Sequence, residues 1–274
     1  MRKKLYSRNV LRDVRYMIEV NEKPLERLVG GYSYTSIFRK IAFVGDSLSS
    51  GEFEAKDTKG KIFHDLYEYS WGQFIARRNG LEAYNFSRGG MTTKEYIKSF
   101  AENNGFWDKD KACQAYVIAL GINDLYHCGM ELGSIKDIDK KDYRNNGKTF
   151  AGYYAQIISR YKEISPDAKF FLVTLPNNDG RKDFKELIEN MIKLLSDFSN
   201  YFSNTYVIDI YNYADVQNDE FRENYNLGGH MNPMGYIYAA EIIDSYIDYI
   251  IRNNPSDFKH VGLINSGIDY VDKF

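Results

Sequence analysis

Cysteine is scarce in this sequence, which contains only Cys113 and Cys128 among its 274 residues. Two cysteines cannot build the disulfide framework of a small secreted domain, and their spacing matches no metal-binding motif. We therefore expect two free thiols, which fits a reducing compartment. No cluster of histidine, cysteine and carboxylate residues suggests a metal site, so we expect neither a metal nor a cofactor.

Long apolar runs are also missing, since no stretch approaches the roughly 20 apolar residues of a membrane span. The basic N-terminus resembles the start of a signal peptide, but Arg12, Asp13 and Arg15 interrupt the part that would have to be apolar. The net charge is −2 at pH 7, so the chain has no overall basic field to hold nucleic acid phosphates. These observations predict a cytoplasmic protein with neither a membrane span nor a nucleic-acid partner.

Short apolar runs alternate with helical patterns along the chain. Such runs are typical of strands that are buried on both faces, and strands that alternate with helices predict a parallel sheet covered by helices. The expected strands are Ile41–Val44, Ala83–Phe86, Tyr116–Leu120, Phe170–Leu175 and Tyr206–Ile210. The first expected helix begins after Ser70. The others are expected over Thr92–Ala101, Phe150–Ile164, Phe184–Phe202 and Pro233 to about Ile251. We predict an α/β fold with a five-stranded, mainly parallel sheet in a three-layer α/β/α sandwich.

The predicted strands and helices divide the chain into three parts. Residues 1–40 precede the first strand and form an N-terminal extension that we expect to pack on the core, with Val14–Val20 as an extra strand or a flap. Residues 41–253 contain all the predicted elements and form one domain. Residues 254–274 contain few long apolar stretches and are expected to lie as a tail over the surface.

Polar residues with catalytic potential follow the first three strands. Ser47 follows the first strand after Gly45, Gly90 follows the second, and Asn123 follows the third. In open parallel sheets, ligands bind beyond the carboxyl ends of the strands, so these residues are expected at one edge. A serine hydroxyl can act as a nucleophile, and an asparagine amide can donate to a developing oxyanion. Taken singly, the Ser47 and Asn123 segments are equally compatible with an ordinary turn, and the Gly90 segment fits an ordinary turn better than a site.

His230 follows the last predicted strand and directly precedes the last helix, which begins with Asn232-Pro233. The sequence holds only four histidines, so few bases compete for a catalytic role. His64 lies in a polar loop, His127 closely follows Asp124, and His260 lies in the tail. We therefore expect His230 to be the catalytic base, with His127 as a weaker rival.

Together these segments resemble the SGNH hydrolase superfamily, the GDSL-type esterases, lipases and acylhydrolases. The resemblance rests on Gly45-Asp46-Ser47-Leu48, Gly90, Gly121-Ile122-Asn123-Asp124 and His230, which occur in the family's order. It implies a flavodoxin-like α/β/α sandwich, with Ser47 as nucleophile and His230 as base. The same resemblance implies an oxyanion hole made of the N–H groups of Ser47 and Gly90 and the side-chain amide of Asn123.

The sequence departs from the family pattern at Leu227, where the family usually has an aspartate three residues before the histidine. The third member of the triad is therefore unknown. A backbone carbonyl near Leu227 is the favoured substitute, because Gly228 and Gly229 allow the chain to curl toward the ring. Alternatively, a nearby acid takes the place of the aspartate, or the protein is a weak or inactive relative. The candidate acids are Asp215, Asp219 and Glu223.

The resemblance implies hydrolysis of carboxylic esters with small or medium acyl groups through an acyl-Ser47 intermediate. An acetyl group on a carbohydrate is the substrate that the family suggests, and the expected partner is a small-molecule ester. Acyl transfer to a second alcohol and a non-catalytic binding module are the alternatives. A nucleotide-binding site is disfavoured, because no segment matches G-x-G-x-x-G or a Walker A loop. The segment Leu125–Lys148 is expected to form part of the site wall, with Tyr126 and Met130 as candidate lining residues.

Overall fold

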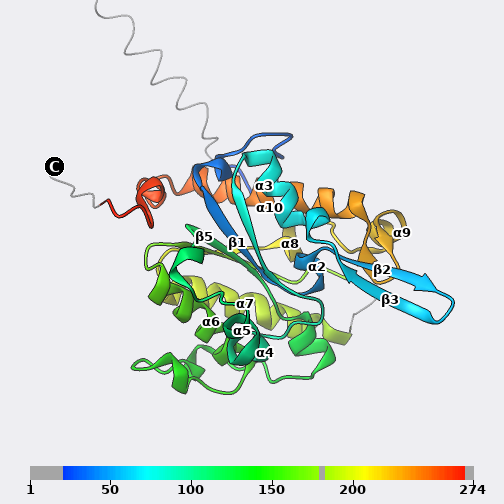
Figure 1. Ribbon diagram of the computed structural model, residues 1–274, viewed down its shortest axis with the longest axis horizontal. Helices are drawn as coiled ribbons and strands as arrows, with labels where there is room; N and C mark the ends of the chain where they lie inside the picture. Colours follow the sequence, from blue (N-terminus) through cyan, green and yellow to red (C-terminus); the bar gives the residue numbers. More distant parts are fainter. Residues whose placement is uncertain (1–20, 179–182, 269–274) are drawn as a thin grey trace, which may run out of the picture.

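The sheet at the centre of the molecule has five strands, in the order β4-β1-β5-β6-β7, and every neighbouring pair is parallel (Figure 1). The computed structural model describes residues 21–178 and 183–268, so the predicted strand or flap at Val14–Val20 lies outside the described residues. The strands are β1 (Lys40–Gly45), β4 (Glu82–Ser87), β5 (Ala115–Ala119), β6 (Lys169–Val173) and β7 (Thr205–Ile208). All five predicted strands are therefore confirmed, with bounds that shift by one or two residues at every end.

Helices cover both faces of this sheet and complete three layers (Figure 1). Alternate residues of β1 point to opposite faces: Ala42 and Val44 pack against α6 and α7, whereas Ile41 and Phe43 pack against α3 and α10. The longer helices are α3 (Trp71–Asn79), α6 (Phe150–Ile164), α7 (Lys185–Tyr201), α9 (Asp219–Tyr225) and α10 (Pro233–Asn253). The predicted three-layer α/β/α sandwich is thus confirmed.

Short helical turns link these elements. They are η1 (Tyr34–Ile37), α2 (Ser47–Ser50), η2 (Tyr67–Tyr69), α4 (Thr93–Glu95), η3 (Tyr96–Phe100), α5 (Ala101–Asn103), η4 (Lys109–Lys111), η5 (Asn123–His127), η6 (Ile135–Asp137), η7 (Tyr143–Asn145), α8 (Ile210–Tyr213) and η9 (Val261–Leu263). Ser70 caps α3 as its spacing predicts, because its hydroxyl accepts a hydrogen bond from the N–H of Gln73 at 3.1 Å. The helix predicted over Thr92–Ala101 is present but contains a π-helical turn, η3.

Two small hairpins were not predicted. Strands β2 (Glu52–Asp57) and β3 (Gly60–Asp65) form an antiparallel hairpin that projects from the body of the molecule (Figure 1). Strands β8 (Asn226–Leu227) and β9 (His230–Met231) form a shorter hairpin just before α10. Both carry many charged, polar or exposed residues, so they lack the continuous apolar run by which the central strands were identified.

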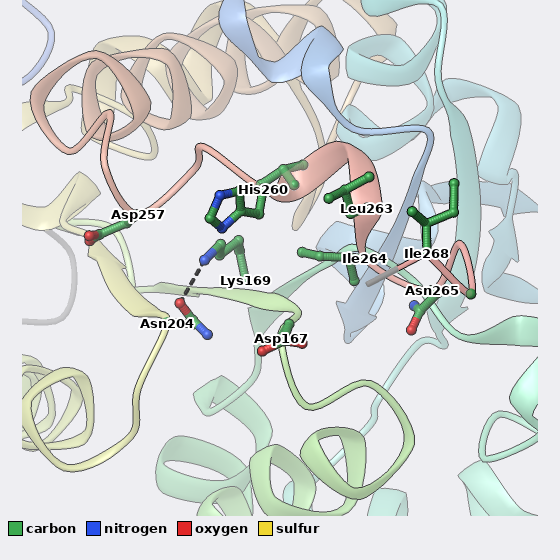
Figure 2. Close-up of a pocket in the computed structure, with 11 residues that line it drawn as sticks. Asp167, Lys169, Asn204, Asp257, His260, Leu263, Ile264, Asn265 and Ile268 are labelled. Atoms are coloured by element: carbon green, nitrogen blue, oxygen red, sulfur yellow. Dashed lines mark hydrogen bonds between the residues drawn. The ribbon is translucent and has the colours of Figure 1, made fainter. Parts of the chain in front are cut away.

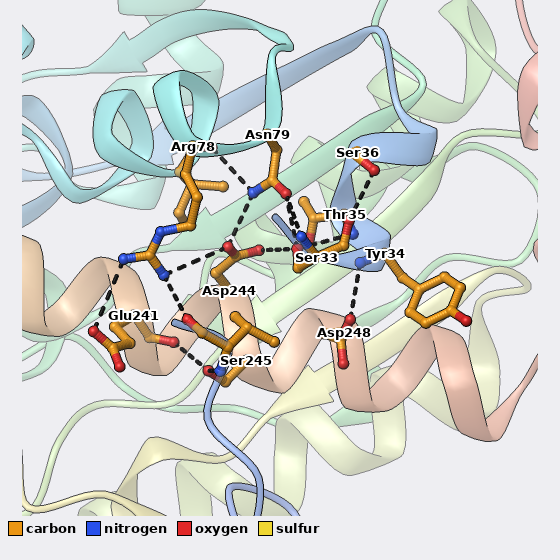
Figure 3. Close-up of polar contacts among 12 residues, drawn as sticks. Ser33, Tyr34, Thr35, Ser36, Arg78, Asn79, Glu241, Asp244, Ser245 and Asp248 are labelled. Atoms are coloured by element: carbon orange, nitrogen blue, oxygen red, sulfur yellow. Dashed lines mark hydrogen bonds and ion pairs between the residues drawn. The ribbon is translucent and has the colours of Figure 1, made fainter. Parts of the chain in front are cut away.

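A buried polar network fastens the segment that precedes β1 to the body of the molecule (Figure 3). The carboxylate of Asp244 in α10 is fully buried and accepts hydrogen bonds from Ser33 Oγ at 2.8 Å and from Asn79 Nδ2 of α3 at 2.9 Å. Burial raises the pKa of Asp244, while the hydrogen bonds that it accepts and the positive charge of Arg78 act in the opposite direction. At the other end of the chain, Phe258 and Val261 are buried against the α10 face of the sheet.

Candidate active site

Ser47 is positioned by the turn that leads from β1, the second strand of the sheet, into α2. Gly45 has no room for a side chain, because a Cβ there would lie 2.1 Å from Ser49 Oγ and 2.9 Å from the carbonyl oxygen of Ala119. Asp46 caps α2, and its carboxylate accepts a hydrogen bond from the N–H of Leu48 at 3.1 Å. Burial raises the pKa of Asp46 to about 7, and this hydrogen bond opposes the shift. Ser47 therefore begins a helical turn at the carboxyl end of the strand.

The loops after β4 and β5 carry Gly90 and Asn123, and hydrogen bonds join them. Asn123 Nδ2 donates to the carbonyl oxygen of Met91 at 3.0 Å. The buried carboxylate of Asp124 accepts from the N–H of Thr93 at 2.9 Å and from Thr93 Oγ1 at 2.6 Å. These bonds hold the two loops in a fixed relation and leave the second amide hydrogen of Asn123 for another acceptor. The sequence did not reveal this role of Asp124.

His230 lies on β9, beside the β2–β3 hairpin. The N–H of Gly229 donates to Glu54 Oε2 at 2.6 Å, and the Phe63 ring meets the imidazole edge-on with 5.6 Å between ring centroids. Burial lowers the pKa of His230, while the charges of Glu54 and Asp65 act in the opposite direction. A lowered pKa keeps the imidazole neutral near pH 7, the form that can accept a proton.

One cavity of about 590 Å³ brings the four sequence-predicted residues together: Ser47, Gly90, Asn123 and His230 all line it. Leu48, Ile122, Tyr126 and His127 add to its wall. The expectation that Tyr126 lines the site is met, but Met130 is not among the lining residues and packs against the core on the α6 and α7 face instead. The cavity lies beyond the carboxyl ends of β1, β4 and β5, where open parallel sheets bind ligands.

A second, largely apolar cavity of about 60 Å³ adjoins this site on the side of α10. Five residues line both cavities: Leu48, Ile122, Leu175, Pro176 and Gln217. Asp46 and Leu48, the chain neighbours of Ser47, both line the small cavity, whereas Ser47 itself lines the larger one. Because a cavity needs about 10–15 Å³ to hold one water molecule, the small cavity has room for only a few water-sized groups.

A larger cavity of about 780 Å³ lies at the opposite end of the sheet (Figure 2). Lys169 at the start of β6 and Asn204 just before β7 line it, and Lys169 Nζ donates to Asn204 Oδ1 at 2.6 Å. The C-terminal segment around His260 forms its other wall (Figure 2). None of the sequence-predicted site residues lines this cavity, so its size does not make it the catalytic site.

The structure does not contain the predicted backbone partner of His230. The Nδ1 atom is buried and has no hydrogen-bond partner within the described residues. Leu227 is 48% exposed, and its backbone pairs with that of His230 in the β8–β9 ladder, so it does not curl toward the ring. Nor do the candidate acids reach the imidazole: all three are exposed, and none makes an ion pair or hydrogen bond with it in the described part of the chain. These acids are Asp215, Asp219 and Glu223.

A carboxylate that the sequence did not suggest faces His230 instead. Glu52 Oε1 lies 3.5 Å from His230 Nε2, and both side chains are largely shielded from solvent. Glu52 is the first residue of β2, a strand that was not predicted, and it is separated from His230 by most of the chain. No periodicity or spacing in the sequence marks this residue.

Two further observations limit the kinds of site that the chain presents. Among residues 21–178 and 183–268, no group of three or more histidine, cysteine, aspartate or glutamate side chains is arranged to hold a metal ion. Within the same ranges, no helix combines the length and the apolar character that a bilayer crossing requires.

Comparisons with known proteins were made for both the sequence and the fold. A family model described as GDSL-like lipase/acylhydrolase matches residues 41–243. A search of curated proteins finds no match. A family two carbohydrate esterase from Clostridium thermocellum, solved in complex with cellohexaose, is similar in structure, with a TM-score of 0.55 and 19% identity over 86% of this chain and 66% of that chain. A lipase/acylhydrolase from Enterococcus faecalis has a TM-score of 0.51 and 20% identity over 79% of this chain and 96% of that chain.

Proposed function

The chain belongs to the GDSL-like lipase/acylhydrolase family and is an SGNH-type esterase; from this premise we propose that it hydrolyses esters through an acyl-Ser47 intermediate. The observation that carries the proposal is the shared cavity, which is lined by Ser47, His230 and the two candidate oxyanion-binding residues, Gly90 and Asn123. A nucleophile, a base and hydrogen-bond donors around one space are the parts that acyl transfer needs.

The proposed reaction has two steps. His230 takes the proton of Ser47 Oγ as this oxygen attacks the ester carbonyl, and the imidazolium then gives that proton to the departing alcohol. A water molecule, deprotonated by His230 in the same way, attacks the acyl-Ser47 ester and releases the acid. In both steps the negative oxygen of the tetrahedral intermediate accepts hydrogen bonds from the N–H groups of Ser47 and Gly90 and from the Asn123 amide.

Labelling with a fluorophosphonate probe tests the nucleophile. We expect the wild type to gain one phosphonyl group, the Ser47→Ala variant to gain none, and Ser196→Ala, which alters an exposed serine of α7, to label like the wild type. Intact-protein mass spectrometry measures the result. A folded wild type that stays unlabelled would contradict the proposal and favour a non-catalytic binding module.

The small apolar cavity that adjoins the one lined by Ser47 leads us to propose a short acyl group. Among p-nitrophenyl esters, we expect kcat/KM to be highest between acetate and butyrate, because a longer acyl chain cannot be buried in a cavity of about 60 Å³. For octanoate we expect kcat/KM to be at least about tenfold lower, which corresponds to a loss of only about 1.4 kcal/mol. In the Leu175→Ala variant the cavity is larger, so the optimum moves to longer chains. A rate that keeps rising to octanoate in the wild type would contradict this assignment.

We propose an acetylated carbohydrate as the substrate class. The cavity that Ser47 and His230 line also has polar residues in its wall, among them Gln217, Arg222 and Asn226. Asn226 Oδ1 is buried and has no hydrogen-bond partner within the described residues, so it can accept a bond from a substrate hydroxyl. The structural similarity to a carbohydrate esterase agrees with this class. Release of acetate from acetylated sugars is the corresponding assay.

A further inference from the structure

The backbone of Glu52 is held beside the segment that carries His230. The hydroxyl of Tyr236 donates to the carbonyl oxygen of Glu52 at 2.7 Å, and Tyr236 is fully buried in the first turns of α10. His230 precedes the same helix by only a few residues. The start of β2 and the turn that carries His230 are therefore fixed to one rigid element, and the distance between Glu52 and the imidazole is set by the fold.

The carboxylate of Glu52 has few positively charged partners available besides His230. Glu52 is 8% exposed, and in the described ranges of the chain His230 is the only lysine, arginine or histidine with a nitrogen within 4.0 Å of its carboxylate. On its other side the carboxylate lies against Gly89, where an added Cβ would fall 2.1 Å from Oε2. A carboxylate so close to the Gly90 loop would destabilise the negatively charged oxygen of the tetrahedral intermediate unless a positive charge lies beside the carboxylate. The imidazolium that forms during the reaction supplies that charge.

The neighbouring groups of the β2–β3 hairpin complete the surroundings of the imidazole. Glu54 fixes the turn at Gly229 and pairs with Lys61 of β3, and the charge of Asp65 acts on both His230 and Glu52. His127 and Arg222 line the same cavity as Glu52 and His230. Burial and the charge of Asp65 raise the pKa of Glu52, and a positive charge on His230 would favour its ionised form.

We propose that Glu52 is the positioning residue of His230: its carboxylate orients the imidazole and stabilises the imidazolium, in place of an acid at position 227. This role rests on the proposed Ser47–His230 chemistry. Because Nε2 of His230 faces Glu52, the proton of Ser47 Oγ goes to the other ring nitrogen, Nδ1, which has no partner within the described residues. The new positive charge then faces the negative charge of Glu52, and no proton passes to the carboxylate. Position 227 is exposed leucine, and strand β2 supplies the carboxylate instead.

Titration of His230 by NMR tests the contact without relying on activity. A nearby carboxylate favours the charged imidazole, so the isosteric Glu52→Gln variant is expected to titrate at a lower pH than the wild type. In Glu52→Asp the carboxylate is drawn back by one methylene, and an intermediate midpoint is expected. Glu102→Gln, which removes an exposed carboxylate from α5, serves as the matched control and leaves the midpoint unchanged. A His230 midpoint that is the same in the wild type and in both Glu52 variants would overturn the proposal.

Kinetics separate this role from the proposed function. We expect Glu52→Gln to lower kcat about 10²-fold or more with little change in KM, since disturbing the carboxylate of a triad costs up to about 10⁴. The acid limb of kcat/KM moves to lower pH with the His230 midpoint. If hydrolysis depends on Ser47, but kcat and the acid limb of the kcat/KM profile are the same in Glu52→Gln as in the wild type, the role of Glu52 is contradicted and the proposed function is not. If no hydrolysis depends on Ser47, the proposed function fails, and the NMR midpoints still decide whether Glu52 acts on His230.

Discussion

Replacing His230 by alanine is expected to lower kcat for a short-chain ester by about 10⁴- to 10⁶-fold, the range found when a member of a serine triad is lost. The variant keeps Ser47, Gly90 and Asn123, but nothing then removes the proton of the serine hydroxyl. A hydroxyl that keeps its proton is a poor nucleophile at neutral pH. Steady-state hydrolysis measures the loss, and circular dichroism verifies that the variant is folded.

Two other histidines provide the controls for this experiment. His64→Ala removes an exposed histidine of β3, on the same hairpin as Phe63, and should leave kcat within about twofold because surface changes have small effects. His127 lines the same cavity as His230 and is the rival base. A His230→Ala variant that retains a tenth of the activity, together with a His127→Ala variant that loses it, would move the base to His127.

The central sheet was predictable because burial on both faces leaves a direct mark on the sequence. The three inner strands, β1, β5 and β6, are apolar runs buried along nearly their whole length, and β1 alternates between the two hydrophobic clusters without an exposed residue from Ile41 to Val44. The edge strands β4 and β7 are only partly buried, so they leave a weaker mark. The β2–β3 hairpin leaves no such mark. Its outer half is exposed, and its charged residues read as an ordinary polar loop. What stabilises it is tertiary: the contacts of Glu52, Glu54 and Phe63 with the turn that carries His230.

The site residues likewise fall into those that the sequence could predict and those that it could not. Ser47, Gly90 and Asn123 could be found because each follows a strand, and parallel strands end at a common edge. Their order along the chain then matched a known family. The carboxylate that faces His230 could not be predicted, because it comes from β2 and not from the residues near position 227. A side chain on an unpredicted strand has no sequence signal that relates it to a residue so far along the chain.

The hydrogen bonds between the loops after β4 and β5 suggest that the proposed oxyanion hole is rigid before substrate binds. Asn123 is tied to Met91, next to Gly90, and Asp124 is tied twice to Thr93. Donors that are already fixed do not have to reorganise when negative charge develops, which is the main reason such sites stabilise transition states. The contribution of a single donor should therefore be large.

Replacing Asn123 by alanine is accordingly expected to lower kcat by about 10²- to 10³-fold, the usual cost of losing one oxyanion donor. KM should change little, because the neutral ester carbonyl needs this donor far less than the oxyanion does. Since the substitution also removes the bond from Asn123 Nδ2 to Met91, a loosened Gly90 loop could lower activity by another route. Thermal unfolding of the variant, together with its KM, reveals any such loosening.

Asn123→Asp adds a second test, because it keeps the size of the side chain but replaces the amide, which donates to Met91 and to the proposed oxyanion, by a carboxylate that can donate to neither. A negative group beside the developing oxyanion repels it, so we expect this variant to lose at least as much kcat as the alanine variant at pH 8. Protonation of the new carboxyl restores a donor, so the deficit relative to wild type should shrink toward pH 5. If instead the alanine variant keeps more than a third of the wild-type kcat, the oxyanion is held by backbone N–H groups alone and Asn123 serves only to anchor the loop at Met91.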